Sequence, residues 1–79
     1  MDYVDIFLAP NLEGSGLSYP PRIVRDAAGG ERVLLRGIHG WEDEGAVEHV
    51  ARLDARGLVL ISTDDAVYLM TAEDYEHSR

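Results

Sequence analysis

The sequence predicts a small α+β domain with two layers, in which one helix packs on an antiparallel sheet of four to five strands. Two observations lead to this fold class. Short runs rich in β-branched residues are separated by glycine, proline and aspartate, and one longer stretch, residues 42–56, spaces its apolar residues as a helix does. With 79 residues and no cysteine, the chain is expected to form a single domain, residues 1–79, without disulfides. The expected order is strand, strand, strand, helix, strand, strand, followed by a short acidic helix or turn.

Three strands are expected in the first half of the chain. Residues 3–9 alternate apolar side chains between two faces, and a proline follows them. Residues 11–19 contain two glycines and few apolar residues, which is typical of a flexible surface loop. Residues 22–26 and 31–37 are two further strands, joined by a four-residue hairpin connection at 27–30.

The helix is expected over Glu42–Arg56. Acidic residues in its first turn favour the positive end of the helix dipole, and Gly57 is expected to end it in the left-handed conformation. The apolar stripe facing the sheet comprises Ala46, Val47, Val50 and Leu53.

Two more strands and a capping motif complete the chain. Residues 58–62 and 66–71 are strands joined by a tight turn at 63–65. Residues 58–61 are apolar at every position, which predicts a central strand covered on both faces. The run Thr71-Ala72-Glu73-Asp74 resembles a capping box and predicts the short C-terminal helix.

Charge is the most informative functional feature of the sequence. The net charge is −8 and there is no lysine. From Glu42 to Arg79 ten acids face three arginines, a net of −7, whereas residues 1–41 sum to −1. Such a field repels nucleic acid and anionic membranes, so neither is expected as a direct partner, and it attracts a basic protein surface. The alternative is a solvated acidic face that binds nothing.

The residues predicted to contact such a partner combine the acids with one aromatic anchor. Trp41 precedes the first acidic run, where an aromatic side chain suits an interface, although a core position fits a lone tryptophan equally well. The predicted partner-binding set is Trp41, Glu42, Asp43, Glu44, Glu48, Asp64, Asp65, Glu73, Asp74 and Glu76.

The sequence contains no recognisable catalytic, metal or cofactor motif. His39, Asp43 and His49 match no established spacing of metal ligands. Ser15 lies between two glycines but lacks the nucleophile elbow of a hydrolase. We therefore expect no enzymatic activity, no metal and no cofactor. The longest apolar runs are too short to span a membrane, and the N-terminus lacks the basic start of a signal peptide, which favours a cytoplasmic protein.

Two resemblances accompany these observations. The segments Leu53-Asp54-Ala55-Arg56-Gly57-Leu58-Val59 and Leu69-Met70-Thr71 resemble the second half of a winged-helix DNA-binding domain, spanning Ala46 to Thr71. This resemblance implies a transcription regulator or assembly module. By its size and its acidic groups the chain also resembles small phage-encoded inhibitors, namely anti-CRISPR proteins and DNA mimics. That resemblance implies a non-enzymatic inhibitor that engages a nucleic-acid-binding complex of a host defence system, and it is the preferred hypothesis.

Overall fold

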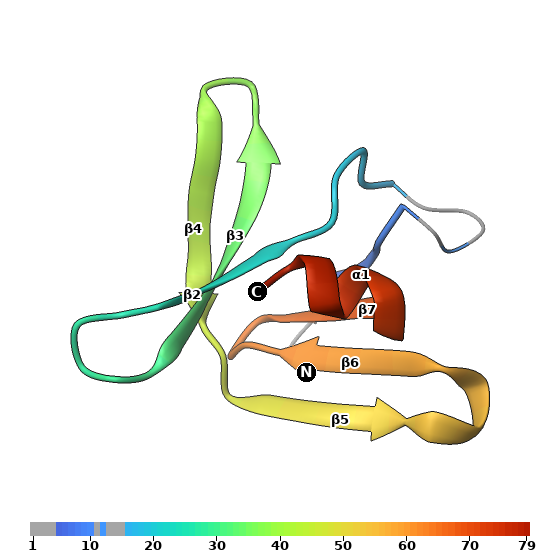
Figure 1. The fold of residues 1–79 in the computed structure, drawn as a ribbon. Helices are drawn as coiled ribbons and strands as arrows, with labels where there is room; N and C mark the ends of the chain where they lie inside the picture. The colour runs from blue at the N-terminus through green and yellow to red at the C-terminus, as the bar shows by residue number, and fades with distance from the viewer. Residues whose placement is uncertain (1–4, 11, 13–15) are drawn as a thin grey trace.

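The protein consists of two β-sheets and one short helix in a computed structural model, which describes residues 5–10, 12 and 16–79 (Figure 1). Sheet A has the strand order β1 (Asp5–Leu8), β7 (Ala66–Thr71), β6 (Leu58–Ser62) and β5 (His49–Leu53). Sheet B has the order β2 (Arg22–Arg25), β3 (Glu31–Gly37) and β4 (Gly40–Ala46). A 3-10 turn, η1 (Asp54–Arg56), joins β5 to β6, and α1 (Ala72–His77) follows β7. Strands β1 and β7 are parallel, and all other neighbouring strands are antiparallel.

The predicted fold class is wrong, because the helix expected over Glu42–Arg56 does not form. Those residues make most of β4, all of β5 and η1. Gly45 adopts a φ of +124°, which no helix accommodates. The apolar spacing that indicated a helix serves two short strands instead, and only Val47 and Val50 of the expected stripe pack against the core. The favourable charges of a helix start contribute about 0.3–1 kcal/mol each, too little to compete with the pairing of two strands in separate sheets.

The same segment is the one in which the winged-helix resemblance implies a recognition helix. A recognition helix would have to occupy the segment that forms β4 and β5, where the described backbone is extended. A helix would place Glu44 and Glu48 one turn apart on a single face, but Glu44 lies in β4 and Glu48 precedes β5.

Several local predictions outside that segment are confirmed, whereas the strands expected over residues 3–9 and 22–26 are the shorter β1 and β2, with residues 3 and 4 outside the described residues. Strands β3, β6 and β7 have the expected bounds, and the hairpin before β3 is closed by a bond from Asp26 N to Gly30 O of 2.9 Å. Thr71 caps α1, its hydroxyl oxygen accepting from Asp74 N at 3.1 Å. Gly57 is left-handed with a φ of +65°, although it ends η1 rather than a long helix. The glycine–serine loop expected at residues 11–19 falls in part outside the described residues, Ser15 included.

The chain passes from one sheet to the other between β4 and β5. Val47 N donates to Glu31 O of β3 at 2.8 Å, whereas the next residue, Glu48, donates to Ser62 O of β6 at 2.8 Å. Just before this point the register skips Glu44, because Val33 pairs with Gly45 and Leu34 pairs with Asp43. Such a bulge bends a strand and lets it turn a corner between packed sheets. The strands of sheet B therefore run across those of sheet A (Figure 1).

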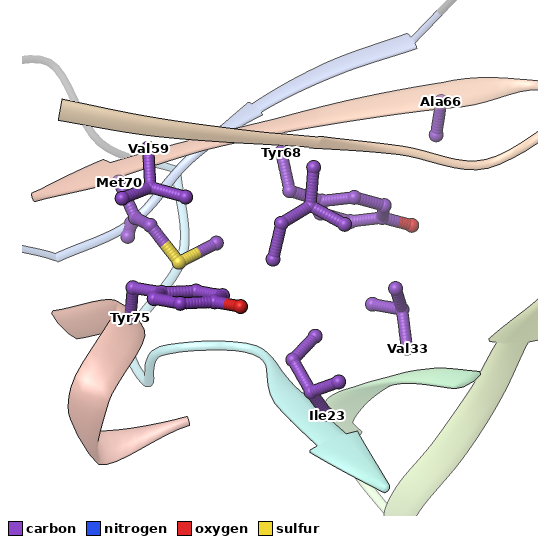
Figure 2. Packing of buried hydrophobic residues seen from close by; sticks show 9 residues of the cluster. Ile23, Val33, Val59, Ala66, Tyr68, Met70 and Tyr75 are labelled. Carbon is purple, nitrogen blue, oxygen red and sulfur yellow. The ribbon is translucent and has the colours of Figure 1, made fainter. Parts of the chain in front are cut away.

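The core lies between the two sheets and is closed by α1. Figure 2 shows Val59 and Met70 pointing from sheet A toward Tyr75 of α1, and Tyr68 on the side of the core where Ile23 and Val33 of sheet B lie. The buried apolar cluster comprises Ala9, Ile23, Val33, Val59, Ile61, Ala66, Tyr68, Met70 and Tyr75. Within the described part of the chain, no helix has the length and hydropathy to cross a membrane.

Candidate functional site

Three segments that are distant in sequence meet where the two sheets join. The bulged end of β4 lies against the β6–β7 turn, since a Cβ on Gly45 would be 3.8 Å from the Cβ of Thr63. Strand β1 starts at the same turn, where Asp5 N donates to Asp65 O at 3.2 Å. Each of these segments carries acidic residues, so the fold gathers carboxylates at this junction.

The charges that act on Glu44 and on Tyr68 identify the acidic residues around this junction; the carboxylate of Glu42 itself lies beside Gly37, where an added Cβ would be 2.9 Å from it. Burial raises the pKa of Glu44 above its usual value, and the charges of Glu42, Asp65 and Asp43 raise it further. Burial likewise raises the pKa of Tyr68 to about 12, with added contributions from Glu44, Asp65 and Asp5. We call Asp5, Glu42, Glu44 and Asp65 the junction cluster.

The charges of the junction cluster are not balanced by arginine. Among the residues that the structure describes, the ion pairs are Arg32–Asp43 and Arg79–Glu31, and neither includes a member of the cluster. Asp65 Oδ1 accepts a hydrogen bond from the hydroxyl of Thr63 at 3.1 Å, which orients that carboxylate without neutralising it. Burial, together with the neighbouring negative charges, thus disfavours the ionised form of Glu44 in the isolated protein.

Asp43 differs from the junction cluster although it lies in the same acidic run. Its carboxylate accepts from Arg32 Nε at 2.6 Å and from Gly45 N at 2.8 Å. These two bonds, that of Arg32 first, hold the pKa of Asp43 below its usual range. The carboxylate of Asp43 therefore stabilises the bulge at Gly45 and neutralises Arg32, so it adds no unpaired charge to the surface.

Trp41 is separated from the junction cluster, although Asp43 lies on its own face of β4. Successive strand residues point to opposite faces, so Trp41 and Glu42 lie on opposite sides of sheet B. The Arg22 guanidinium carbon is 5.4 Å from the centre of the Trp41 ring, and the Tyr19 ring is 6.5 Å away in an edge-to-face arrangement. The Arg36 guanidinium in turn lies 6.0 Å from Tyr19. This arginine–aromatic patch was not predicted from the sequence, since its members come from separate segments.

The remaining predicted residues are distributed over other parts of the surface or buried. Asp64 is exposed in the β6–β7 turn beside the junction cluster, and Glu48 is exposed just before β5. Glu73 and Glu76 are exposed on α1, which begins at the far end of β7 from Asp65, about 17 Å along the strand. Asp74 is only 3% exposed and is not a surface group. The structure therefore brings together Glu42, Glu44 and Asp65 of the predicted set, and it adds Asp5.

The carboxylates of the junction cluster are suited to binding cationic groups. Within the described ranges, no three acidic or histidine side chains are placed to hold a metal ion, and no pocket is found. His39 and His49, considered above as metal ligands, are both exposed. Carboxylates in this arrangement accept charge-assisted hydrogen bonds, most favourably from the planar fork of a guanidinium.

Comparisons with known proteins give no further guide to function. No protein-family model, curated protein or solved structure matches this chain.

Proposed function

We propose that this chain is a binding protein whose junction cluster engages an arginine- or lysine-rich surface of another protein. The observation that carries the proposal is the convergence of Glu42, Glu44 and Asp65 from two sheets, with the pKa of Glu44 raised by burial and by its acidic neighbours. Guanidinium or ammonium groups placed among these carboxylates would relieve their mutual repulsion. A basic partner would therefore gain binding energy by neutralising the carboxylates whose negative charges disfavour one another in the free protein.

Surfaces with clustered arginine and lysine are characteristic of proteins that bind nucleic acid. A rigid acidic platform that fits such a surface excludes DNA or RNA from it. The proposed activity is therefore inhibition of a nucleic-acid-binding protein by occupation of its basic cleft, as a DNA mimic or anti-CRISPR protein acts. The rigidity comes from strands of two sheets, which limits the ordering penalty on binding.

The experiment compares two variants of identical net charge. In the first, Glu42 and Glu44 are changed to Gln and Asp65 to Asn. In the matched control, Glu73 and Glu76 are changed to Gln and Asp54 to Asn, which removes three exposed acids far from the junction cluster. Both are tested with the wild-type chain for capture of nucleic-acid-binding proteins from a lysate at low and at high salt. Captured proteins are then challenged with duplex DNA.

The proposal expects the junction variant to lose capture and the control variant to retain it. Capture by the wild-type chain should weaken as salt rises, and duplex DNA should compete. Equal loss in both variants would mean that net charge alone is responsible. Capture that persists in the junction variant would overturn the proposal.

A further inference from the structure

The outer face of sheet B, opposite the core, is basic in a chain of net charge −8. Successive strand residues point to opposite faces, and the inward ones include Ile23 and Val33, which are buried in the core (Figure 2). The alternation and the register place the following side chains on the outer face: Arg22, Val24, Arg32, Leu34, Arg36, Trp41 and Asp43. This face therefore carries three arginines and one aspartate.

Two of these arginines have no carboxylate partner among the described residues. Arg32 is paired with Asp43 at 2.6 Å, whereas neither Arg22 nor Arg36 forms an ion pair with any residue that the structure describes. Each of these two guanidinium groups lies instead over a ring of the arginine–aromatic patch, 5.4 Å and 6.0 Å from the ring centre. The ring contact holds the guanidinium in place and leaves its positive charge available to an anion.

Arg22 and Arg36 are close enough to act on one partner. Arg22 pairs with Leu34 across β2 and β3, and Arg36 follows two residues later on the same face of β3. Such diagonal neighbours are about 7–8 Å apart, a distance that two long side chains can bridge. Tyr19 and Trp41, over which the two arginines lie, contact each other edge to face with ring centres 6.5 Å apart. The arginine–aromatic patch is thus one continuous surface of two cations and two rings.

The patch has the form of a platform for a polymer rather than a site for a small molecule. Tyr19 is 56% exposed, and Arg22 and Arg36 are also exposed. No pocket is found within the described ranges, so a ligand would lie along the sheet instead of entering it. Sheet surfaces that combine aromatic and cationic side chains suit single strands of nucleic acid, because bases stack on rings or guanidinium planes while phosphates pair with arginine.

We propose that the arginine–aromatic patch binds single-stranded nucleic acid, with a base stacked on Tyr19 and the adjoining phosphates held by Arg22 and Arg36. Charge and aromatic content together favour this occupant. A duplex keeps its bases within the helix and cannot offer them to the ring. An acidic protein segment would pair with the arginines, but its carboxylates would gain nothing from the exposed ring of Tyr19.

The acidity of the rest of the chain limits the affinity without preventing binding. Net charge disfavours nucleic acid as a direct partner, as the sequence predicts, but exposed charges are screened over about 8 Å at physiological ionic strength. A strand on the outer face of sheet B therefore responds mainly to the arginines beneath it. Asp43, the acid on this face, is neutralised by Arg32, and Glu42 lies on the opposite side of the sheet. Binding is expected to be weak, in the micromolar range or above.

The test is titration of the purified chain with an oligothymidylate of about eight nucleotides, followed by the anisotropy of a dye on the oligonucleotide and by the fluorescence of Trp41. Trp41 is the single tryptophan of the chain, so its emission reports on the patch itself. Arg22→Gln combined with Arg36→Gln removes both cations. Arg25→Gln combined with Arg56→Gln is the matched control, because these exposed arginines lie outside the patch and the change in net charge is the same.

A second pair of variants tests the aromatic ring. Tyr19→Ala removes the ring, whereas Tyr19→Phe keeps the ring and removes the hydroxyl alone. Circular dichroism checks that each variant is folded, which is expected because all the substituted side chains are exposed. A duplex of the same length and an oligoglutamate peptide are titrated in parallel.

The proposal expects the oligothymidylate to quench Trp41 and to bind the wild-type chain, the matched control and Tyr19→Phe alike. Tyr19→Ala and the double variant at Arg22 and Arg36 should each bind about tenfold more weakly. A wild-type chain that does not bind the oligonucleotide would overturn the proposal, as would an equal loss of binding in the matched control. Equal binding of the duplex, or equal quenching of Trp41 by the oligoglutamate peptide, would overturn it too, the latter in favour of an acidic protein segment.

Discussion

Replacing Gly45 by alanine tests the observed fold against the fold predicted from the sequence. The substitution should lower the free energy of unfolding if the observed fold is right, and raise it if the segment is a helix. Gly45 has a φ of +124°, a conformation that L-residues rarely adopt. An added Cβ would meet Thr63 Cβ at 3.8 Å, an ordinary contact, so the effect comes from the backbone alone. Holding alanine in such a region costs about 1–3 kcal/mol. In the interior of a helix the same change would stabilise the chain by about 1 kcal/mol.

The effect is measured as the change in the free energy of unfolding, from urea titrations followed by circular dichroism. Gly16→Ala is the matched control, because Gly16 has no positive φ and nothing lies within 4 Å of an added Cβ. Its change should stay within about 0.5 kcal/mol. Equal stability of Gly45→Ala and the wild-type chain, or a gain in stability, would refute the assignment of this segment to a bulged strand.

Three further predictions concern the core, the cap and the junction cluster. Ile61→Ala should destabilise the chain by about 2–5 kcal/mol, and Leu60→Ala by much less, because Ile61 is fully buried whereas Leu60 lies on the opposite face of β6 and is only partly buried; equal losses in urea unfolding would contradict the assignment of the two faces. Thr71→Ala removes the hydroxyl that caps α1 and should lower the free energy of unfolding by about 0.5–2 kcal/mol, whereas Thr71→Ser should restore most of it. Burial and acidic neighbours raise the pKa of Glu44 from 4.5, so the folded protein favours the protonated carboxyl. The stability gained in this way is present below pH 4.5 and is lost as pH rises through the folded-state pKa. Glu44→Gln should therefore stabilise the chain more at pH 7 than at pH 4, and an equal effect at both values in urea titrations would contradict the coupling.

Strands β3, β6 and β7 were predictable from the sequence because their signals are local. Short apolar runs bounded by turn residues are enough to define them, and the Thr71 cap lies within four residues of the backbone group it binds. The segment 42–56 was mispredicted because its local signals conflict with its tertiary environment. The backbone bonds of Val47 to β3 and of Glu48 to β6 place the two halves of this segment in different sheets, which its local charge and apolar spacing do not reveal.

The candidate site was predicted in part for the same reason. Glu42, Glu44 and Asp65 were identified from the charge of the second half of the chain. Asp5 was not, because only the parallel pairing of β1 with β7 brings it to Asp65, sixty residues later. The separation of Trp41 from Glu42 follows from the two faces of β4, which a helical interpretation of the same residues could not reveal.

The most direct test of the junction cluster is the carboxyl pKa of Glu44, measured by NMR titration in the wild-type chain and in the Asp65→Asn variant. The account predicts a pKa above the usual value for glutamate in the wild-type chain, and a lower pKa in the variant, because Asp65 is one of the charges that raise it. A pKa at the usual value, or one that Asp65→Asn leaves unchanged, would contradict the convergence of the two sheets on one acidic site.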